Sequence, residues 1–288
     1  MSNPFTEARP RAYPFALAVA FFTAIVPFAC GASAAAAGDM SMNNMSMNKM
    51  PMKAAVAPAP AYQWSGCYVG INGGGGAGSS NFTTTVGAGS YLLVGAGGSD
   101  PGEVTSDGTG SHNNSNVVGG GQAGCNWQSG TVVFGLEGDF DYFRSTSAFY
   151  NNTNTLPTSG NAFVIGQSIT SDYLATVRPR IGVAADRNFA YITGGAAFTD
   201  AKYTESYADG GGGIGVATAS KFLTGWTAGA GWEYAWTDHW TVKFEYLYSA
   251  FPTTGVTGVI TGPGGTNPLH GSADLVIQLA RAGLNFKF

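Results

Sequence analysis

The chain has 288 residues, of which 44 are glycine and only 10% are charged, against about 25% charged residues in ordinary soluble domains. Hydrophobic residues make up 44% of the chain, but beyond the N-terminus they are not gathered into the blocks of ~20 residues that a transmembrane helix requires. The net charge of −4 provides no broad positive field, so the sequence excludes nucleic acid as a partner.

The first 34 residues predict an export signal. Arg9 and Arg11 precede an apolar stretch from Ala12 to Ala29, and the small residues Ala32-Ser33-Ala34 then offer a site for a signal peptidase. The alternative is an uncleaved membrane anchor, which the prolines of the apolar stretch disfavour. After cleavage the chain keeps two cysteines, in a compartment where thiols can be oxidised.

Residues 35–63 predict a flexible or extended linker rich in methionine, alanine and proline. Its six methionines are Met40, Met42, Met45, Met47, Met50 and Met52. Thioether sulfur is a soft ligand suited to Cu(I), and the close spacing of these residues lets several sulfurs converge on one ion. The cluster is therefore a candidate Cu(I) or Ag(I) site. The alternative is a low-complexity spacer, and no other cofactor is predicted.

From residue 64 to residue 288 one pattern repeats and predicts an all-β domain. Eight stretches of about a dozen residues are rich in Tyr, Phe, Val, Thr, Ala and Gly: 64–78, 117–128, 132–143, 173–184, 189–202, 221–234, 240–251 and 274–288. Short connections at 129–131, 185–188 and 235–239 alternate with long ones at 79–116, 144–172, 203–220 and 252–273. This alternation is typical of an eight-stranded antiparallel up-and-down transmembrane barrel.

The period-2 pattern within the stretches supports the barrel, because alternate residues of a membrane strand face lipid. In 240–251 the large apolar side chains occupy even positions, whereas Lys243 and Glu245 occupy odd ones. In 173–184, Arg178 and Arg180 likewise lie opposite the aliphatic face. In five of the eight stretches no charged residue needs to face lipid, where each would cost about 2–4 kcal/mol near mid-bilayer.

The inward charged residues predict a set of ion pairs in the lumen. They are Glu137, Asp139, Asp141, Arg178, Arg180, Glu233, Lys243, Glu245 and Arg281. Counted from the short turns, Glu137 and Asp139 are level with the two arginines of the next strand, and Glu245 is level with Arg281. An eight-stranded barrel is just wide enough for side chains to fill it, so we expect a closed ionic plug. The alternative is a narrow solute channel.

Four motifs carry a resemblance to a known family. They are Trp-Ser-Gly-Cys-Tyr-Val-Gly at 64–70, Gly-Gly-Gly-Gln-Ala-Gly-Cys-Asn-Trp-Gln at 119–128, Gly-Leu-Glu-Gly-Asp-Phe at 135–140 and Ala-Gly-Leu-Asn-Phe-Lys-Phe at 282–288. Over about residues 62–288 the chain resembles the small outer-membrane β-barrel (porin-like, outer-membrane immunogenic protein) family. The resemblance implies an OmpA-like barrel in the outer membrane of a Gram-negative cell, in contact with its lipid, with the linker in the periplasm.

The same resemblance implies roles in envelope integrity, adhesion or surface antigenicity, and no enzymatic reaction. Arg281, Gly283, Phe286 and Phe288 fit the closing pattern that the barrel-assembly machinery recognises, so that machinery is an expected partner. The long loops are the expected binding site for a host or surface ligand. The competing functions are a structural or interaction barrel, a narrow porin-like channel, and an envelope protein that binds Cu(I) or Ag(I).

Two departures from the family pattern matter. Cys67 and Cys125 stand where the family usually has aromatic residues, on adjacent antiparallel strands and both facing outward. They form either a cross-strand disulfide or two lipid-facing thiols. Pro179 stands within the fourth strand, where the family tends to have glycine. Because proline lacks an N–H group, we expect a bulge or irregular pairing there.

The histidines offer a weak alternative to a purely structural role. His112 and His270 are expected in the first and last long loops, where they could meet near Asp100, Asp107 or Asp274, and His239 lies in a short turn. Such a group would provide a metal or acid–base site. We favour solvated histidines, because the predicted loops are rich in Gly, Ser and Asn.

Overall fold

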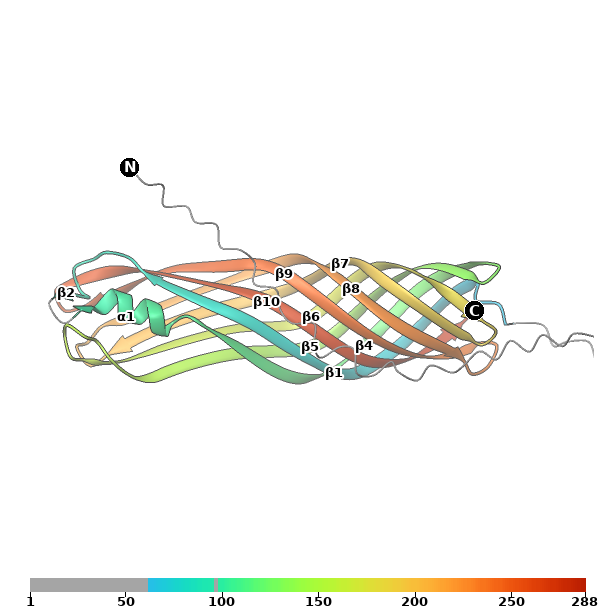
Figure 1. The fold of residues 1–288 in the computed structure, drawn as a ribbon, viewed down its shortest axis with the longest axis horizontal. Coiled ribbons are helices and arrows are strands. Elements are labelled where there is room, and N and C mark those ends of the chain that lie inside the picture. The colour runs from blue at the N-terminus through green and yellow to red at the C-terminus, as the bar shows by residue number, and fades with distance from the viewer. Residues whose placement is uncertain (1–61, 96–97) are drawn as a thin grey trace, which may run out of the picture. The chain divides into compact units, whose positions relative to one another are not determined.

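The computed structural model describes residues 62–95 and 98–288. Within them eight antiparallel strands close into a barrel (Figure 1), in the order β1-β10-β9-β8-β7-β6-β5-β4. Their bounds are β1 Gly66–Val86, β4 Gly110–Ser129, β5 Val132–Thr155, β6 Ala162–Ala185, β7 Asn188–Asp209, β8 Ile214–Ala235, β9 Trp240–Gly262 and β10 Gly265–Lys287. Each of the eight predicted stretches falls on its own strand, so the predicted fold class is confirmed.

The connection between β1 and β4 carries the remaining elements. β2 (Val94–Gly95) pairs with β3 (Gly98–Ser99), and α1 follows at Asp100–Asp107. The helix starts there because the Ser99 hydroxyl accepts a hydrogen bond from the Gly102 backbone N–H at 3.2 Å, and a proline occupies the first turn. Among residues 62–95 and 98–288, no helix has both the length and the apolar character needed to cross a membrane.

The strands are 20 to 24 residues long, about twice the predicted length. The prediction of four long loops is therefore wrong for three of them, since only residues 156–161, 210–213 and 263–264 separate those strand pairs. Only the connection from 87 to 109 stays long. The error has a physical cause: beyond the apolar stretches many outward residues are polar, as at Thr83, Thr85 and Asn113, while the backbone pairing continues.

Backbone pairing between neighbouring strands is interrupted beyond the predicted apolar stretches, toward the end of the barrel where α1 lies. β4 pairs with β5 only over Gly119–Ser129 and Val132–Tyr142. β8 and β9 do not pair between Gly215 and Trp226. One-residue register shifts occur at a comparable level between Tyr142 and Ser145, between Thr170 and Ala175, and between Ala273 and Leu275. Such irregularities bend a strand and re-aim its side chains.

Pro179 has irregular pairing on one side, as expected. It stands opposite Leu136 of β5 in regular register. Toward β7 the paired residues stop at Val177 and resume at Arg180. The register is the same on both sides of this gap, so no bulge forms, and the missing proline N–H accounts for the interruption.

Four layers of side chains fill the described barrel along its axis. The lower apolar cluster, at the short-turn end, consists of Tyr62, Trp64, Val133, Ala184, Phe189, Tyr191 and Ala235. Charged residues lie above it. The middle apolar cluster then includes Phe82, Phe143, Leu174, Leu247 and Leu279, and the upper apolar cluster includes Val104, Leu156, Phe163, Ile165 and Ile260.

The lower cluster closes the short-turn end with a segment that precedes the first strand. Trp64 is almost fully buried; its indole N–H donates to the Asp186 carbonyl at 3.1 Å, and its backbone N–H donates to Gln128 Oε1 at 2.7 Å. Tyr62 packs edge-on against Trp64, with ring centroids 4.9 Å apart. These two residues therefore act as a lid over the end of the barrel.

Candidate functional site

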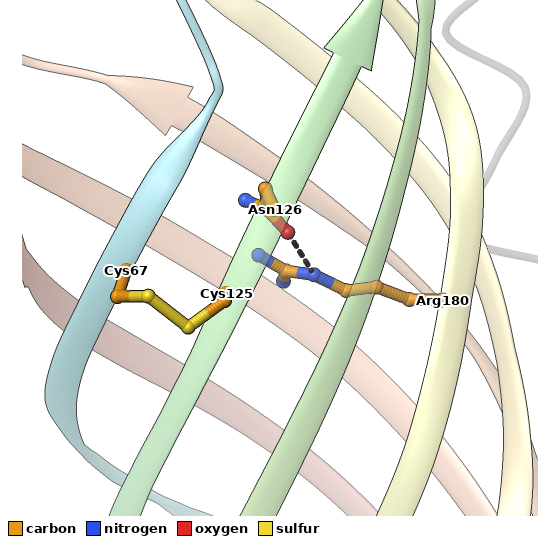
Figure 2. The surroundings of a disulfide bond; sticks show 4 residues. All are labelled: Cys67, Cys125, Asn126 and Arg180. Carbon is orange, nitrogen blue, oxygen red and sulfur yellow. Dashed lines mark hydrogen bonds between the residues drawn. A yellow bond between two sulfur atoms is a disulfide. The ribbon is translucent and has the colours of Figure 1, made fainter.

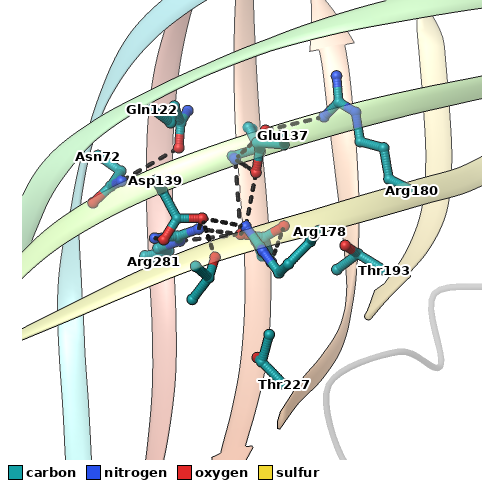
Figure 3. A network of polar contacts seen from close by, with 12 residues as sticks. Asn72, Gln122, Glu137, Asp139, Arg178, Arg180, Thr193, Thr227 and Arg281 are labelled. Carbon is teal, nitrogen blue, oxygen red and sulfur yellow. Dashed lines mark hydrogen bonds and ion pairs between the residues drawn. The ribbon is translucent and has the colours of Figure 1, made fainter. Parts of the chain in front are cut away.

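Nine ionisable side chains from five strands meet inside the barrel (Figure 3 shows part of the group). We call them the ionic plug: Glu137, Asp139 and Asp141 on β5, Arg178 and Arg180 on β6, Glu233 on β8, Lys243 and Glu245 on β9, and Arg281 on β10. All nine are buried, because each occupies an inward position of its strand. The structure thus brings together every residue that the sequence predicted for the lumen, and the predicted buried ion-pair network is confirmed.

Arg178 lies at the centre of the plug. Its Nη2 is 2.8 Å from Glu137 Oε1 and 2.6 Å from Asp139 Oδ2. Its Nη1 is 3.3 Å from Glu245 Oε1 on β9. The contact to Glu137 is a direct cross-strand pair, since the two residues stand opposite each other in the β5–β6 register. One guanidinium therefore joins strands that are not neighbours in the ring.

Arg281 shares two of these carboxylates. Its Nη2 is 3.0 Å from Asp139 Oδ2 and 2.7 Å from Glu245 Oε2. It also pairs with Asp141. Arg281 and Glu245 face each other in the β9–β10 register, as the sequence predicted. Because Asp139 and Glu245 each contact two arginines, the plug is one connected network.

The two remaining cations complete the lower side of the plug. Lys243 Nζ is 2.8 Å from Glu137 Oε1. Arg180 Nη1 is 3.1 Å from Glu233 Oε2 and 3.3 Å from Glu137 Oε2. Arg180 also lies over the rings of Tyr68 and Tyr191, 4.8 Å and 5.1 Å from their centroids. These cation–π contacts join the plug to the lower apolar cluster.

Neutral donors that sequence reasoning missed satisfy the carboxylates further. The Tyr68 hydroxyl donates to Glu137 Oε2 at 2.5 Å, and the Tyr191 hydroxyl donates to Glu245 Oε1 at 3.0 Å. Asn285 Nδ2 donates to Glu233 Oε1 at 2.9 Å. The signal that could have found them is their parity, since each occupies a buried, inward position of its strand.

The composition of the plug explains how a barrel buries so many charges. It holds five carboxylates (Glu137, Asp139, Asp141, Glu233, Glu245) and four cations (Arg178, Arg180, Lys243, Arg281), so its formal charge is −1. An isolated buried charge is very costly, whereas a paired and hydrogen-bonded one is tolerated. Among the described residues, no group of three His, Cys, Asp or Glu side chains is placed to hold a metal ion.

The two cysteines among the described residues join β1 to β4. Cys67 and Cys125 stand opposite each other in the register and form a disulfide with an S–S distance of 2.04 Å (Figure 2). The next residue, Asn126, points to the other side of the sheet, where its Oδ1 accepts a hydrogen bond from Arg180 Nε at 3.0 Å. The structure thus selects the disulfide from the two alternatives, and places it directly outside the plug.

The histidines are not brought together. His112 lies on β4 opposite Ser80, and its ring centroid is 6.3 Å from that of Phe82. His270 lies on β10 opposite Thr85, so the two positions differ by five residues along β1, or about 16 Å. His239 stacks on Phe286 at 5.8 Å. The expectation that His112 and His270 lie in loops is wrong, because both are strand residues.

The aspartates expected near the histidines have other partners. Asp100 Oδ1 accepts from the Thr158 backbone N–H at 2.7 Å, and Asp107 accepts from Asn154 Nδ2. Asp274 Oδ1 accepts from the Asn81 backbone N–H at 2.6 Å. The first two contacts hold α1 against the end of β5 and the connection that follows it, and the third links β10 to β1.

The remaining sequence predictions divide into two groups. Met40, Met42, Met45, Met47, Met50 and Met52, the export signal and the linker up to residue 61 lie outside the described residues. Of the predicted assembly signal, Arg281 belongs to the plug and Gly283 lies beside it, while Phe286 faces outward with its ring 5.1 Å from that of Trp240. Phe288 is exposed. Recognition of these residues by the assembly machinery stays a prediction.

Hydrogen bonds around Asp209 close the end opposite the short turns. This carboxylate accepts from the Tyr91 and Tyr207 hydroxyls, both at 2.7 Å, and from the backbone N–H groups of Gly211 and Gly213. Burial raises the pKa of Asp209, but these four hydrogen bonds outweigh it and hold the pKa below its usual value. Burial and the contact with Asp209 raise the pKa of Tyr91 to about 12.

A closed antiparallel barrel with apolar side chains outside and buried ion pairs inside defines an outer-membrane β-barrel protein. The chain belongs to the outer membrane protein beta-barrel domain family, whose model matches residues 51–265. Its location is the outer membrane. The connection that carries α1 is much longer than any other between the barrel strands. Because the longer connections of such barrels are extracellular and the short turns periplasmic, α1 lies on the extracellular side.

Relatives with assigned names support this placement. The chain is 30% identical over 237 residues to a 31 kDa outer-membrane immunogenic protein of Brucella melitensis, a match that covers 81% of this chain and 87% of the relative. It is 27% identical over 198 residues to a 25 kDa outer-membrane immunogenic protein of Brucella abortus, covering 69% and 70%.

Similar solved structures include outer-membrane barrels. The chain aligns with the outer membrane protease OmpT of Escherichia coli at a TM-score of 0.40 and 9% identity, covering 80% of this chain and 99% of OmpT. It aligns with the outer membrane protein OprG of Pseudomonas aeruginosa at a TM-score of 0.37 and 12% identity, covering 79% and 99%.

Proposed function

We propose that this protein is a closed structural barrel of the outer membrane, with a surface-interaction role at its extracellular end and no solute conduction or catalysis. One observation carries the proposal: three apolar clusters and the ionic plug occupy successive levels of the described interior. Along β6, Arg180 and Arg178 are followed by Leu174 and Ile169, and then by Ile165.

This order of layers disfavours the porin-like alternative. A hydrated ion entering from outside would first meet the upper apolar cluster and then, past buried Glu205, the middle one; within each cluster it would lose its water without gaining a partner. It would then have to break ion pairs of the plug, in which Arg178 and Arg281 each contact three carboxylates. Both steps oppose passage.

The extracellular end supports the interaction role. The connection between β1 and β4 is anchored over the barrel, since Asn267 Oδ1 accepts hydrogen bonds from the backbone of Tyr91 and Leu92 at 3.1 Å and 2.8 Å, while Leu93 and Val94 are exposed. Such an anchored, exposed segment suits recognition by another molecule. The relatives in Brucella are named as immunogenic, and we extend that property to this chain as part of the proposal.

Planar-bilayer recording tests the closed lumen. We expect the wild-type protein, inserted and verified as folded, to give no stable conductance steps. Replacing Phe143 and Leu279 of the middle apolar cluster with alanine should create a cavity there and produce irregular leakage, which shows that the assay detects insertion. Uniform, long-lived steps from the wild-type protein would contradict the proposal and restore the channel hypothesis.

We also propose, from the six clustered methionines, that the segment from Met40 to Met52 binds Cu(I) or Ag(I). The signal-processed, refolded protein should take Cu(I) from a colorimetric chelator under anaerobic conditions, and a variant with all six methionines changed to leucine should not. Leucine keeps the apolar volume but removes the sulfur. Equal copper uptake by both proteins, after the barrel is shown to be folded by circular dichroism, removes this function.

A further inference from the structure

Within residues 62–95 and 98–288, the outward cations beyond the membrane-embedded level all line one groove. The described chain contains nine Lys and Arg residues, of which four belong to the plug. Arg187 and Lys287 lie at the periplasmic end. The other three, Arg144, Lys202 and Lys221, line a single groove of about 540 Å³ on the outside of β5 to β8. A protein with a net charge of −4 thus gathers its remaining positive charge on one face.

The groove lies at the boundary between apolar and charged surface. On β5, outward Tyr142 is followed by outward Arg144; on β7, Phe198 is followed by Asp200 and Lys202. From Ala190, the first apolar outward residue of β7, to Lys202 the tilted strand rises about 30 Å, whereas the apolar band of such barrels is about 25 Å tall. The cations therefore stand at the level of the outer-leaflet headgroups.

Aromatic rings border the groove on its membrane side. Phe222 lines the groove, is largely exposed and stacks on Phe198, with centroids 6.1 Å apart. Phe140 and Tyr173 stack at 5.3 Å on the neighbouring strands. Rings at this level mark the interface of a membrane barrel, and they offer an apolar surface to the acyl chains below a headgroup.

Two carboxylates share the groove without cancelling its charge. Asp172 Oδ1 is 3.8 Å from Arg144 Nε in a largely exposed pair, and Asp200 Oδ1 accepts from the Asp172 backbone N–H at 3.3 Å. Lys221 Nζ donates to the backbone oxygen of Gly255 at 3.3 Å. The groove keeps one net positive charge, and its lysines are positioned for an anion.

We propose that this groove binds the phosphorylated headgroup of an outer-leaflet lipid, with Lys202 and Lys221 contacting phosphate and the acyl chains lying against Phe222. Lysine ammonium groups form charge-assisted hydrogen bonds to phosphate, and cations at a membrane surface attract anionic lipid. Such a lipid would also cover the level at which β8 and β9 do not pair. The proposal goes beyond the closed-barrel function and does not depend on it.

Native mass spectrometry of the folded, signal-processed protein in detergent tests the site. The protein is titrated with diphosphorylated lipid A in EDTA, so that no divalent cation can bridge the carboxylates of Asp172 and Asp200 to phosphate. We expect the Lys202→Gln/Lys221→Gln variant to bind this lipid about 30-fold more weakly, since each cation near an anionic surface contributes a factor of about five. Lipid A lacking both phosphates should bind the wild-type protein no more tightly than diphosphorylated lipid A binds the variant.

The matched control is Arg187→Gln/Lys287→Gln, which removes two cations from the periplasmic end and should leave lipid A binding unchanged. All variants are first shown to be folded by circular dichroism. Equal weakening by the control, or equal binding of phosphorylated and dephosphorylated lipid A, overturns the proposal. If inorganic phosphate at the same concentration displaces lipid A, the groove is a general anion site and the lipid assignment is wrong.

Discussion

Replacing Arg178 with methionine is expected to lower the free energy of unfolding of the barrel by about 3–5 kcal/mol, because breaking a buried ion pair leaves charge without compensation. Arg178 contacts Glu137, Asp139 and Glu245 within 3.3 Å. Its removal changes the plug from five carboxylates and four cations to five and three. Methionine retains much of the side-chain volume, so the effect reports the charge rather than a cavity.

The measurement is equilibrium urea unfolding in detergent, followed by circular dichroism. The matched control is Arg144→Met, which removes an arginine from an exposed pair with Asp172 at 3.8 Å and should change stability by about 1 kcal/mol or less. The double variant Glu137→Gln/Arg178→Met should recover part of the loss, because it removes one uncompensated carboxylate. Equal effects of Arg178→Met and Arg144→Met would contradict a stabilising plug. Arg178 is preferred to Arg281, which also belongs to the predicted assembly signal.

Removing the disulfide is expected to have a comparable effect. The bond joins residues separated by 58 positions, and the chain-entropy model assigns such a loop about 4 kcal/mol through restriction of the unfolded chain. Cys67→Ala, Cys125→Ala and the double variant should each lose this amount, since any one of them abolishes the bridge. Alanine suits the outward, lipid-facing positions because it adds no polar group.

Comparison of the three cysteine variants by urea unfolding gives a test that does not depend on the size of the effect. A bridge requires the two single variants and the double variant to be equally destabilised, whereas independent thiols would give additive losses. Reductant applied during unfolding should lower the stability of the wild type and leave the double variant unchanged. Non-reducing mass spectrometry that finds both thiols free in protein from the native envelope would remove the basis of the prediction.

The sequence by itself determined the number of strands and, for five of them, which face of the lower half-strand points into the barrel. Alternation at period 2 put Arg178 and Lys243 inside, because only one parity of each strand is compatible with lipid. This argument needs no partner strand, and it succeeded for all nine plug residues. It also placed Cys67 and Cys125 on adjacent strands and facing outward, but left their bonding open, since pairing depends on register across the β1–β4 seam.

The tertiary structure decided what depends on contacts between distant parts of the chain. Arg178 contacts carboxylates from β5 and β9 because the barrel is narrow enough for one side chain to reach across it, and that width is set by closure of the ring. On β6 the inward residues change from even numbers at Leu174 to odd numbers at Ser171 and Ile169, because the pairing with β7 shifts by one residue.

The alternation of apolar and polar residues along one strand reveals neither such a register shift nor the width of the barrel. The upper halves of the strands, where many outward residues are polar, therefore resemble loops in the sequence. The folding of Trp64 beneath the strands was hidden for the same reason: its hydrogen bonds to Gln128 and Asp186 join residues that only the closed ring brings together.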